Sequence, residues 1–244
     1  FYEEAKHLSL LASGPSEASD RLTVSLLVDV LQADIAREVC GFEAWNVAPN
    51  DAALSYFNRL PEVEPLTSPS GGEALLKRYR AAPQWLADRE AHLRRGLLEG
   101  KTANAESARR VVEMLDTALA LPTENWPMVS IPKEKVQGQW SEADRVGFIQ
   151  TLSAVVEGEV RPALEAYRAF LIAEILPKAR DEKSSGLVSL PQGARCYEAL
   201  IQYQTTLPLT AAELHATGLA EIERINAAMR DLLNVPHGIL LVTG

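Results

Sequence analysis

The stretch LTAAELHATGLAEIERINAAMRDL, residues 209–232, carries the clearest helix signal of this chain. Thr210 and Glu213 have the spacing of a capping box, in which a threonine hydroxyl and a glutamate carboxylate bond backbone N–H groups of the first turn. Beyond them, apolar residues recur every three or four positions from Leu214 to Leu232, which is the period of an amphipathic helix. This stretch therefore predicts a long helix that begins after Thr210.

The same helical period extends outward through most of the chain. Apolar residues make up 47% of the sequence and aromatic residues only 6%, a composition that favours helices over sheets. No internal repeat and no long heptad array occurs. We therefore expect an all-α, multi-helix fold with long amphipathic helices. The other predicted helical segments are 17–40, 50–60, 72–80, 83–97, 104–121 and 141–177.

Residues 122–140 differ from their surroundings. Pro122, Pro127, Pro132 and Gly138 leave little room for a helix. This stretch is the best candidate boundary, so we expect an N-terminal helical lobe (1–121), a Pro-rich linker (122–140) and a second helical lobe (141–244). In the second lobe, the helix either runs past Pro162 with a kink or restarts there.

The charge and the apolar runs of the sequence exclude two classes of partner. The net charge is −9 and is spread along the chain, so we expect no nucleic-acid partner. No apolar run approaches the roughly 20 residues that span a bilayer, so we expect no membrane span. Because the sequence begins at Phe1, a removed signal peptide or lipid anchor stays open, and with it a cytoplasmic or an exported location.

The two cysteines, Cys40 and Cys196, lie in helix-like surroundings. Such surroundings are typical of buried free thiols. The sequence therefore predicts two unpaired thiols rather than a disulfide, which would form only if the fold brings the two residues together.

No metal-binding motif occurs in the sequence. None of His7, His92, His215 and His237 begins an H-E-x-x-H, which would place two imidazoles one turn apart on a helix with a glutamate beside the metal-bound water. We therefore predict no metal ligands and no catalytic residues in this chain.

Polar side chains gather just before the helix at 210. Tyr197, Tyr203, Thr205 and Thr206 have hydroxyls that can line a cleft or form tertiary contacts and turns. His215 lies one turn inside the helix, where a histidine can either pack or contact a ligand. Both interpretations of each residue are open at this point.

Read in order, a set of spaced motifs resembles the bacterial domain-of-unknown-function family 885, whose members are large helical proteins related to zinc metallopeptidases. The resemblance covers about residues 42–233. It is carried most strongly by Gly186-Leu187, Leu190–Gly193, Tyr197, Thr205-Thr206, Leu209-Thr210, Glu213–Leu219 and Glu221–Ile225.

The resemblance implies a helical peptidase-like fold in a protein about twice this long. In such a protein an H-E-x-x-H helix, a further glutamate ligand and active-site tyrosines lie in the later half, and zinc polarises a peptide carbonyl and activates water. None of those residues has a counterpart here. The sequence also departs from the family after Leu233, so we expect this chain to be the incomplete N-terminal part of the larger fold.

Three hypotheses of function follow. The leading one is the non-catalytic helical portion of a zinc-metallopeptidase-like peptide hydrolase, forming part of the cleft for a peptide substrate. Tyr197, Thr205, Thr206 and His215 would then contact substrate, and apolar surface would be exposed where the rest of the protein packs. The alternative is a catalytically inactive helical scaffold or binding protein derived from the family. The third, a zinc enzyme with an unrecognised site, has the least support.

Overall fold

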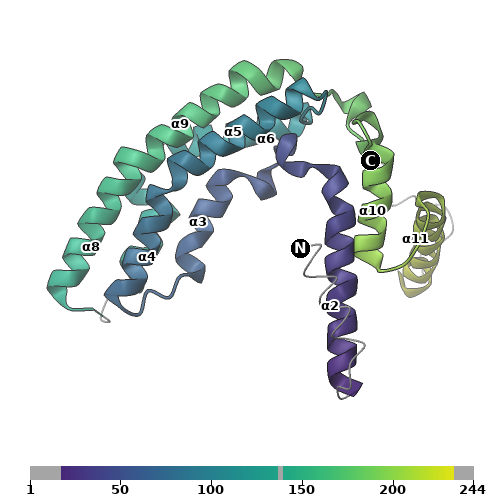
Figure 1. The fold of residues 1–244 in the computed structure, drawn as a ribbon, viewed down its shortest axis with the longest axis horizontal. Coiled ribbons are helices and arrows are strands. Elements are labelled where there is room, and N and C mark those ends of the chain that lie inside the picture. Colours follow the sequence, from purple (N-terminus) through teal and green to yellow (C-terminus); the bar gives the residue numbers. More distant parts are fainter. Residues whose placement is uncertain (1–17, 137–139, 234–244) are drawn as a thin grey trace. The chain divides into compact units, whose positions relative to one another are not determined.

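A computed structural model describes residues 18–136 and 140–233. These residues fold as helices and connecting turns (Figure 1), and the described part of the chain contains no strand beyond one isolated backbone bridge between Asn104 and Arg180. The all-α prediction is confirmed. The described residues divide into two compact units: unit 1 contains residues 18–40 and 192–233, and unit 2 contains residues 41–136 and 140–191.

Unit 1 contains three described helices. They are α2 (Ala18–Arg37), α10 (Gly193–Thr205) and α11 (Ala211–Leu233). Helix α2 packs along α10, and α11 follows α10 after a short turn and contacts it (Figure 1). The capping box predicted for α11 is present, because the Thr210 backbone N–H donates to Glu213 Oε2 at 2.8 Å and the Glu213 N–H donates to Thr210 Oγ1 at 3.2 Å.

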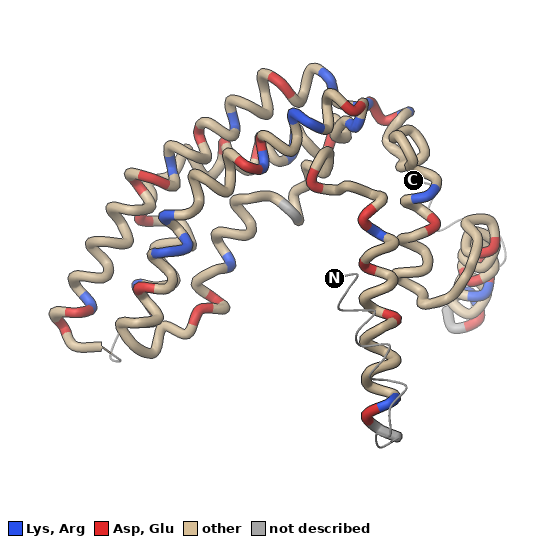
Figure 2. Tube along the Cα trace, in the orientation of Figure 1, with Lys and Arg blue, Asp and Glu red and all other residues tan. Residues whose placement is uncertain are grey.

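Unit 2 is a layered helical assembly around one apolar core. Its largest fully buried side chains include Trp126, Tyr79 and Tyr167. Within it α5 packs on α9, α4 on α8 and α3 on α7, and acidic and basic residues are scattered along the length of the helices (Figure 2). Its helices are α3 (Ala53–Val63), α4 (Pro69–Arg80), α5 (Ala82–Leu98), α6 (Ala105–Leu119), α7 (Pro127–Lys135), α8 (Glu142–Val155) and α9 (Arg161–Phe170).

Several helix boundaries follow local signals in the sequence. The side chain of Asn104 accepts a hydrogen bond from the Ser107 N–H at 2.9 Å and caps α6 at the start of the segment predicted as helical, 104–121. Gly41 and Gly100 adopt positive φ after α2 and α5, where we expected those helices to stop. The helix predicted over 50–60 begins later than expected: Asn50 lies in a short 3-10 turn, and Ala52 precedes α3.

The expectation that residues 122–140 contain no helix is wrong. Helix α7 forms there, with Pro127 in its first turn, where a missing N–H has no intrahelical partner to lose. Met128 and Val129 are fully buried against the core of unit 2, so apolar burial outweighs the effect of the prolines. Separately, the two compact units have other boundaries than the predicted lobes 1–121 and 141–244.

The helix of the second predicted lobe runs past Pro162. Helix α8 continues through a π-helical turn, Val156–Val160, into α9, and Pro162 lies in the first turn of α9. π turns of this kind accommodate local irregularities inside a helix. Over the residues described, no helix combines the length and the apolar content that crossing a bilayer requires.

Candidate functional site

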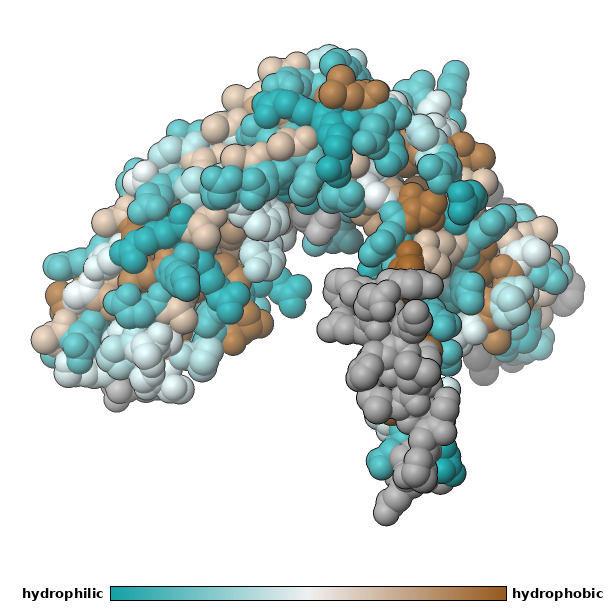
Figure 3. All heavy atoms as spheres, viewed as in Figure 1, coloured by the Kyte–Doolittle hydropathy of each residue, from teal (hydrophilic) through white to brown (hydrophobic). Residues whose placement is uncertain are grey.

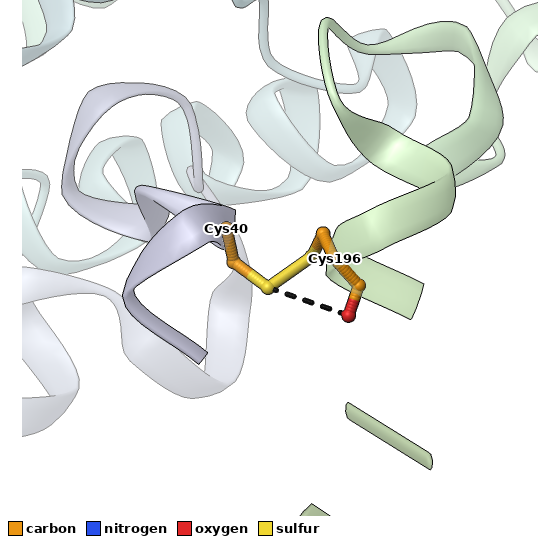
Figure 4. The surroundings of a disulfide bond; sticks show 2 residues. All are labelled: Cys40 and Cys196. Carbon is orange, nitrogen blue, oxygen red and sulfur yellow. Dashed lines mark hydrogen bonds between the residues drawn. A yellow bond between two sulfur atoms is a disulfide. The ribbon is translucent and has the colours of Figure 1, made fainter. Parts of the chain in front are cut away.

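Unit 1 is held together by a disulfide that the sequence analysis did not predict. Cys40 and Cys196 are bonded, with their Cα atoms 4.8 Å apart across 156 residues of sequence. Both are buried, and the Sγ of Cys40 lies 3.6 Å from the Cys196 carbonyl oxygen (Figure 4). The prediction of free thiols is wrong because the pairing depends on α2 packing along α10, which is not visible in the residues around either cysteine.

A groove of about 610 Å³ lies between α2 and α10, and we call it the α2–α10 groove. Apolar side chains from α2 and polar groups from both helices share its surface. On one side, the Arg37 guanidinium lies 4.4 Å from the ring centroid of Tyr203 and also pairs with Asp34 at 2.9 Å. The lining residues are Leu26, Asp29, Val30, Gln32, Ala33, Ala36, Gln202, Tyr203 and Thr206.

Two of the predicted site residues lie at the C-terminal end of α10. Thr206 lines the groove in a left-handed conformation (φ 59°), and its hydroxyl lies 2.6 Å from the Thr205 carbonyl oxygen. The Thr205 hydroxyl donates to the Ile201 carbonyl at 2.7 Å and accepts from the Leu207 N–H at 3.2 Å. Thr205 therefore shapes the end of the helix, while Thr206 is part of the groove surface.

The other two predicted site residues lie apart from that end. Tyr197 is 43% exposed near the start of α10, and its eight-residue separation from Thr205 corresponds to about 12 Å along the helix axis. His215 is exposed on α11, one turn after its start. The structure thus places Thr206 and Tyr203 in one groove but does not bring Tyr197 or His215 into it.

The α2 side of the groove was missed by the sequence analysis. Leu22, Leu26 and Val30 recur every four residues, and this spacing predicted only that residues 17–40 are helical. In the structure these side chains are 63%, 57% and 54% exposed. The pattern alone does not distinguish a face that packs in a core from one that lines a groove, so periodicity gave no signal for this part of the site.

Helix α11 carries a second exposed apolar stripe. Leu219, Ile222, Ile225 and Met229 lie at helical spacing, and each is about half exposed. Figure 3 shows hydrophobic residues at the surface of this helix next to hydrophilic ones. Exposed apolar stripes of this kind are common at interaction surfaces.

The described residues do not meet the ligand requirements of a zinc site. Structural and catalytic zinc sites need at least three His, Cys, Asp or Glu side chains at bonding distance. No such group of three occurs within residues 18–136 and 140–233. Of the four histidines, His92 lies on α5 and His215 on α11, whereas His7 and His237 fall outside the described residues.

Comparison with known proteins gives one family and one structure. The family model "Bacterial protein of unknown function (DUF885)" matches residues 3–235. The chain is also similar to a crystal structure described as "the putative lipoprotein from Colwellia psychrerythraea", with a TM-score of 0.66 and 15% sequence identity. A search of curated proteins finds no match.

The structural match covers 94% of this chain and 48% of the Colwellia chain, so the chain spans about half the length of that relative. At 15% identity the likeness shows a shared helical fold. The family model covers nearly the whole chain, including the segments that form both units. The chain therefore belongs to the bacterial family of unknown function DUF885.

Proposed function

We propose that this chain is the non-catalytic, substrate-binding helical portion of a zinc-metallopeptidase-like peptide hydrolase. The observation that carries the proposal is the α2–α10 groove, which is open to solvent along an apolar helix face and has hydrogen-bonding groups on both walls. The resemblance of the family to helical zinc peptidases supplies the reaction class. The half-length match to the Colwellia chain is consistent with a larger protein that contains the catalytic residues.

The groove has the chemistry that a peptide requires. Leu26 and Val30 offer apolar contacts for peptide side chains, and the Gln202 amide can both donate to and accept from a peptide backbone. The Asp29 carboxylate can pair with a basic side chain or an amino terminus. This mixture of apolar surface and a few polar groups is typical of sites for small peptides.

The predicted contact residues fit this proposal at different positions along α10 and α11. An extended peptide rises about 3.3 Å per residue, so about four residues reach from Thr206 to the level of Tyr197. Thr206 is proposed as a direct contact and Thr205 as a residue that positions it. Tyr197 and His215 remain proposed contacts for substrate that extends beyond the groove.

The role that we propose for this chain does not involve zinc. When bound to the full-length protein it would supply the activated water and polarise the peptide carbonyl. The described residues offer no group of ligands that fits it. The contribution proposed for this chain is therefore to bind and orient the peptide, and we assign no chemical step to its residues.

Filling the groove tests the proposal. Ala33 lines the groove on α2, and Ala33→Trp should block it. In the natural full-length protein we expect kcat/KM for peptide hydrolysis to fall at least tenfold, because bound peptide can no longer reach the catalytic residues in the correct register. The measurement is hydrolysis of a fluorogenic peptide library, followed by kinetics on the best substrate.

Ser25→Trp is the matched control, because Ser25 is exposed on the same helix and does not line the groove. It should leave kcat/KM within twofold of the natural value. Melting temperatures of both variants identify any loss that comes from unfolding. Equal kinetics for the two folded variants would remove the groove from the substrate path, and an absence of peptide hydrolysis in the natural protein would exclude the hydrolase itself.

The exposed stripe on α11 favours one alternative, a catalytically inactive helical scaffold or binding protein. Such a protein would use the apolar stripe to bind a partner and would need no catalytic residues. It predicts that the natural protein binds a partner through α11 and cleaves no peptide. Mass spectrometry of peptides after prolonged incubation separates this alternative from the hydrolase.

A further inference from the structure

Unit 2 contains a separate pocket of about 360 Å³, which we call the Arg180 pocket. It lies where the chain enters unit 2, beside the start of α6, and it includes residues from the segment that follows α9. The pocket combines one cationic side chain with several neutral polar groups and an apolar wall. Its lining residues are Trp45, Asn46, Val47, Asn104, Ser107, Arg180, Ser185 and Leu187.

The positive charge of Arg180 has no counter-charge in the described part of the chain. Its Nε and Nη1 atoms are shielded from solvent and have no hydrogen-bond partner, and no described carboxylate lies within ion-pair distance. The guanidinium carbon lies 5.3 Å from the ring centroid of Trp45. Burial lowers the pKa of Arg180, yet a guanidinium stays protonated in proteins, so the charge persists.

The backbone fixes Arg180 at the edge of the pocket. Its N–H donates to the Ala103 carbonyl at 2.8 Å, and its carbonyl accepts from the Ala105 N–H at 2.8 Å. These two bonds form the isolated bridge to Asn104. The guanidinium is therefore presented by a rigid backbone and stacks on an indole ring, which is the preorganised arrangement that anion recognition requires.

The remaining lining groups complement an anion with an apolar part. The Ser107 and Ser185 hydroxyls can donate hydrogen bonds to an oxyanion, and Val47, Leu187 and the Trp45 indole form apolar surface. Carboxylates and phosphates share the oxyanion that pairs with arginine. A phosphate has no apolar group that could pack against the apolar wall, whereas a carboxylic acid with a short aliphatic chain has such a group.

We propose that the Arg180 pocket binds an organic carboxylate that carries a short apolar group. The free carboxyl end of a peptide and a small branched carboxylic acid both belong to this class. The carboxylate neutralises the guanidinium, and the aliphatic chain lies against the indole and the two aliphatic side chains. This site is in unit 2 and is independent of the groove proposed for peptide binding in unit 1.

The test is a titration of the 15N-labelled chain with isovalerate, followed through the Trp45 indole N–H signal. We expect a saturable shift with a Kd of about 1 mM, because so small a ligand makes few contacts. Neutral isovaleramide, which has the same shape without the charge, should bind at least tenfold more weakly. Inorganic phosphate is the second probe, and it should also bind at least tenfold more weakly than isovalerate.

Three variants complete the test. Arg180→Gln should weaken isovalerate binding at least tenfold, whereas Arg80→Gln, at an exposed arginine of α4, removes the same charge and should leave the Kd unchanged. Ser185→Trp should block the pocket without removing a buried side chain. Its isovalerate binding therefore tests the proposal if Arg180→Gln does not fold. Four results would each overturn the proposal. Two concern the ligands: isovalerate and isovaleramide bind equally, or phosphate binds more tightly than isovalerate. The other two are that folded Arg180→Gln or Ser185→Trp binds isovalerate as well as the parent does, and that no saturable shift occurs.

Discussion

Replacing Cys40 and Cys196 together with alanine should lower the free energy of unfolding by about 5 kcal/mol. The disulfide closes a loop of 156 residues, and the entropy that it removes from the unfolded chain grows with the logarithm of that length. The full decrease in the free energy of unfolding is expected when both units unfold in one transition. Urea unfolding of the parent and the double variant, followed by circular dichroism, gives the two free energies.

Reductant provides the control for this prediction. It should lower the urea midpoint of the parent to that of the double variant and leave the double variant unchanged. The native parent should contain no titratable thiols. Two titratable thiols in the native protein, or equal midpoints for parent and variant, would contradict the structure at this position. A bond of this kind persists in oxidising compartments, so its presence in protein from the source cells would support export from the cytoplasm.

Gly96→Ala should lower the free energy of unfolding by about 3 kcal/mol. Gly96 is buried in α5 where that helix packs against the short helical turn Phe42–Ala44. A Cβ atom there would lie 1.8 Å from the Ala44 carbonyl oxygen, so the two backbones must separate. This overpacking exceeds the roughly 1 kcal/mol that alanine gains over glycine inside a helix.

Gly147→Ala is the matched control for Gly96→Ala. Gly147 is exposed in α8, and a Cβ atom there meets nothing within 4 Å. The substitution should therefore raise the free energy of unfolding by about 1 kcal/mol through helix propensity alone. Urea unfolding measures both variants. A shift of the same sign in both would show that α5 does not approach the turn at Phe42–Ala44 as closely as described.

The parts of the fold that could be predicted from sequence depend on local hydrogen bonds. The caps at Asn104 and Thr210 and the stop at Gly41 each involve residues within a few positions of one another. The helix at Pro127–Lys135 and the disulfide depend on packing between distant segments. Such contacts override propensity and leave no pattern in the neighbouring sequence.

The candidate site divides in the same way. Thr206 was identified from its place before the α11 capping box, and it lines the groove. The α2 wall was not identified, because Leu26 and Val30 have the same spacing whether a helix face packs in a core or borders a groove. Arg180 was not identified as a site residue, because its missing counter-charge becomes visible only when the surrounding residues are placed.

The most direct test of the central claim is photo-cross-linking of a peptide to the natural protein. A substrate peptide that carries a benzophenone side chain is irradiated with the protein, and the attachment sites are located by mass spectrometry. We expect attachment to residues of the α2–α10 groove, with Leu26, Val30 or Tyr203 among them, and competition by unlabelled peptide. Competed attachment confined to residues outside α2 and α10 would contradict the assignment of this chain to the substrate cleft.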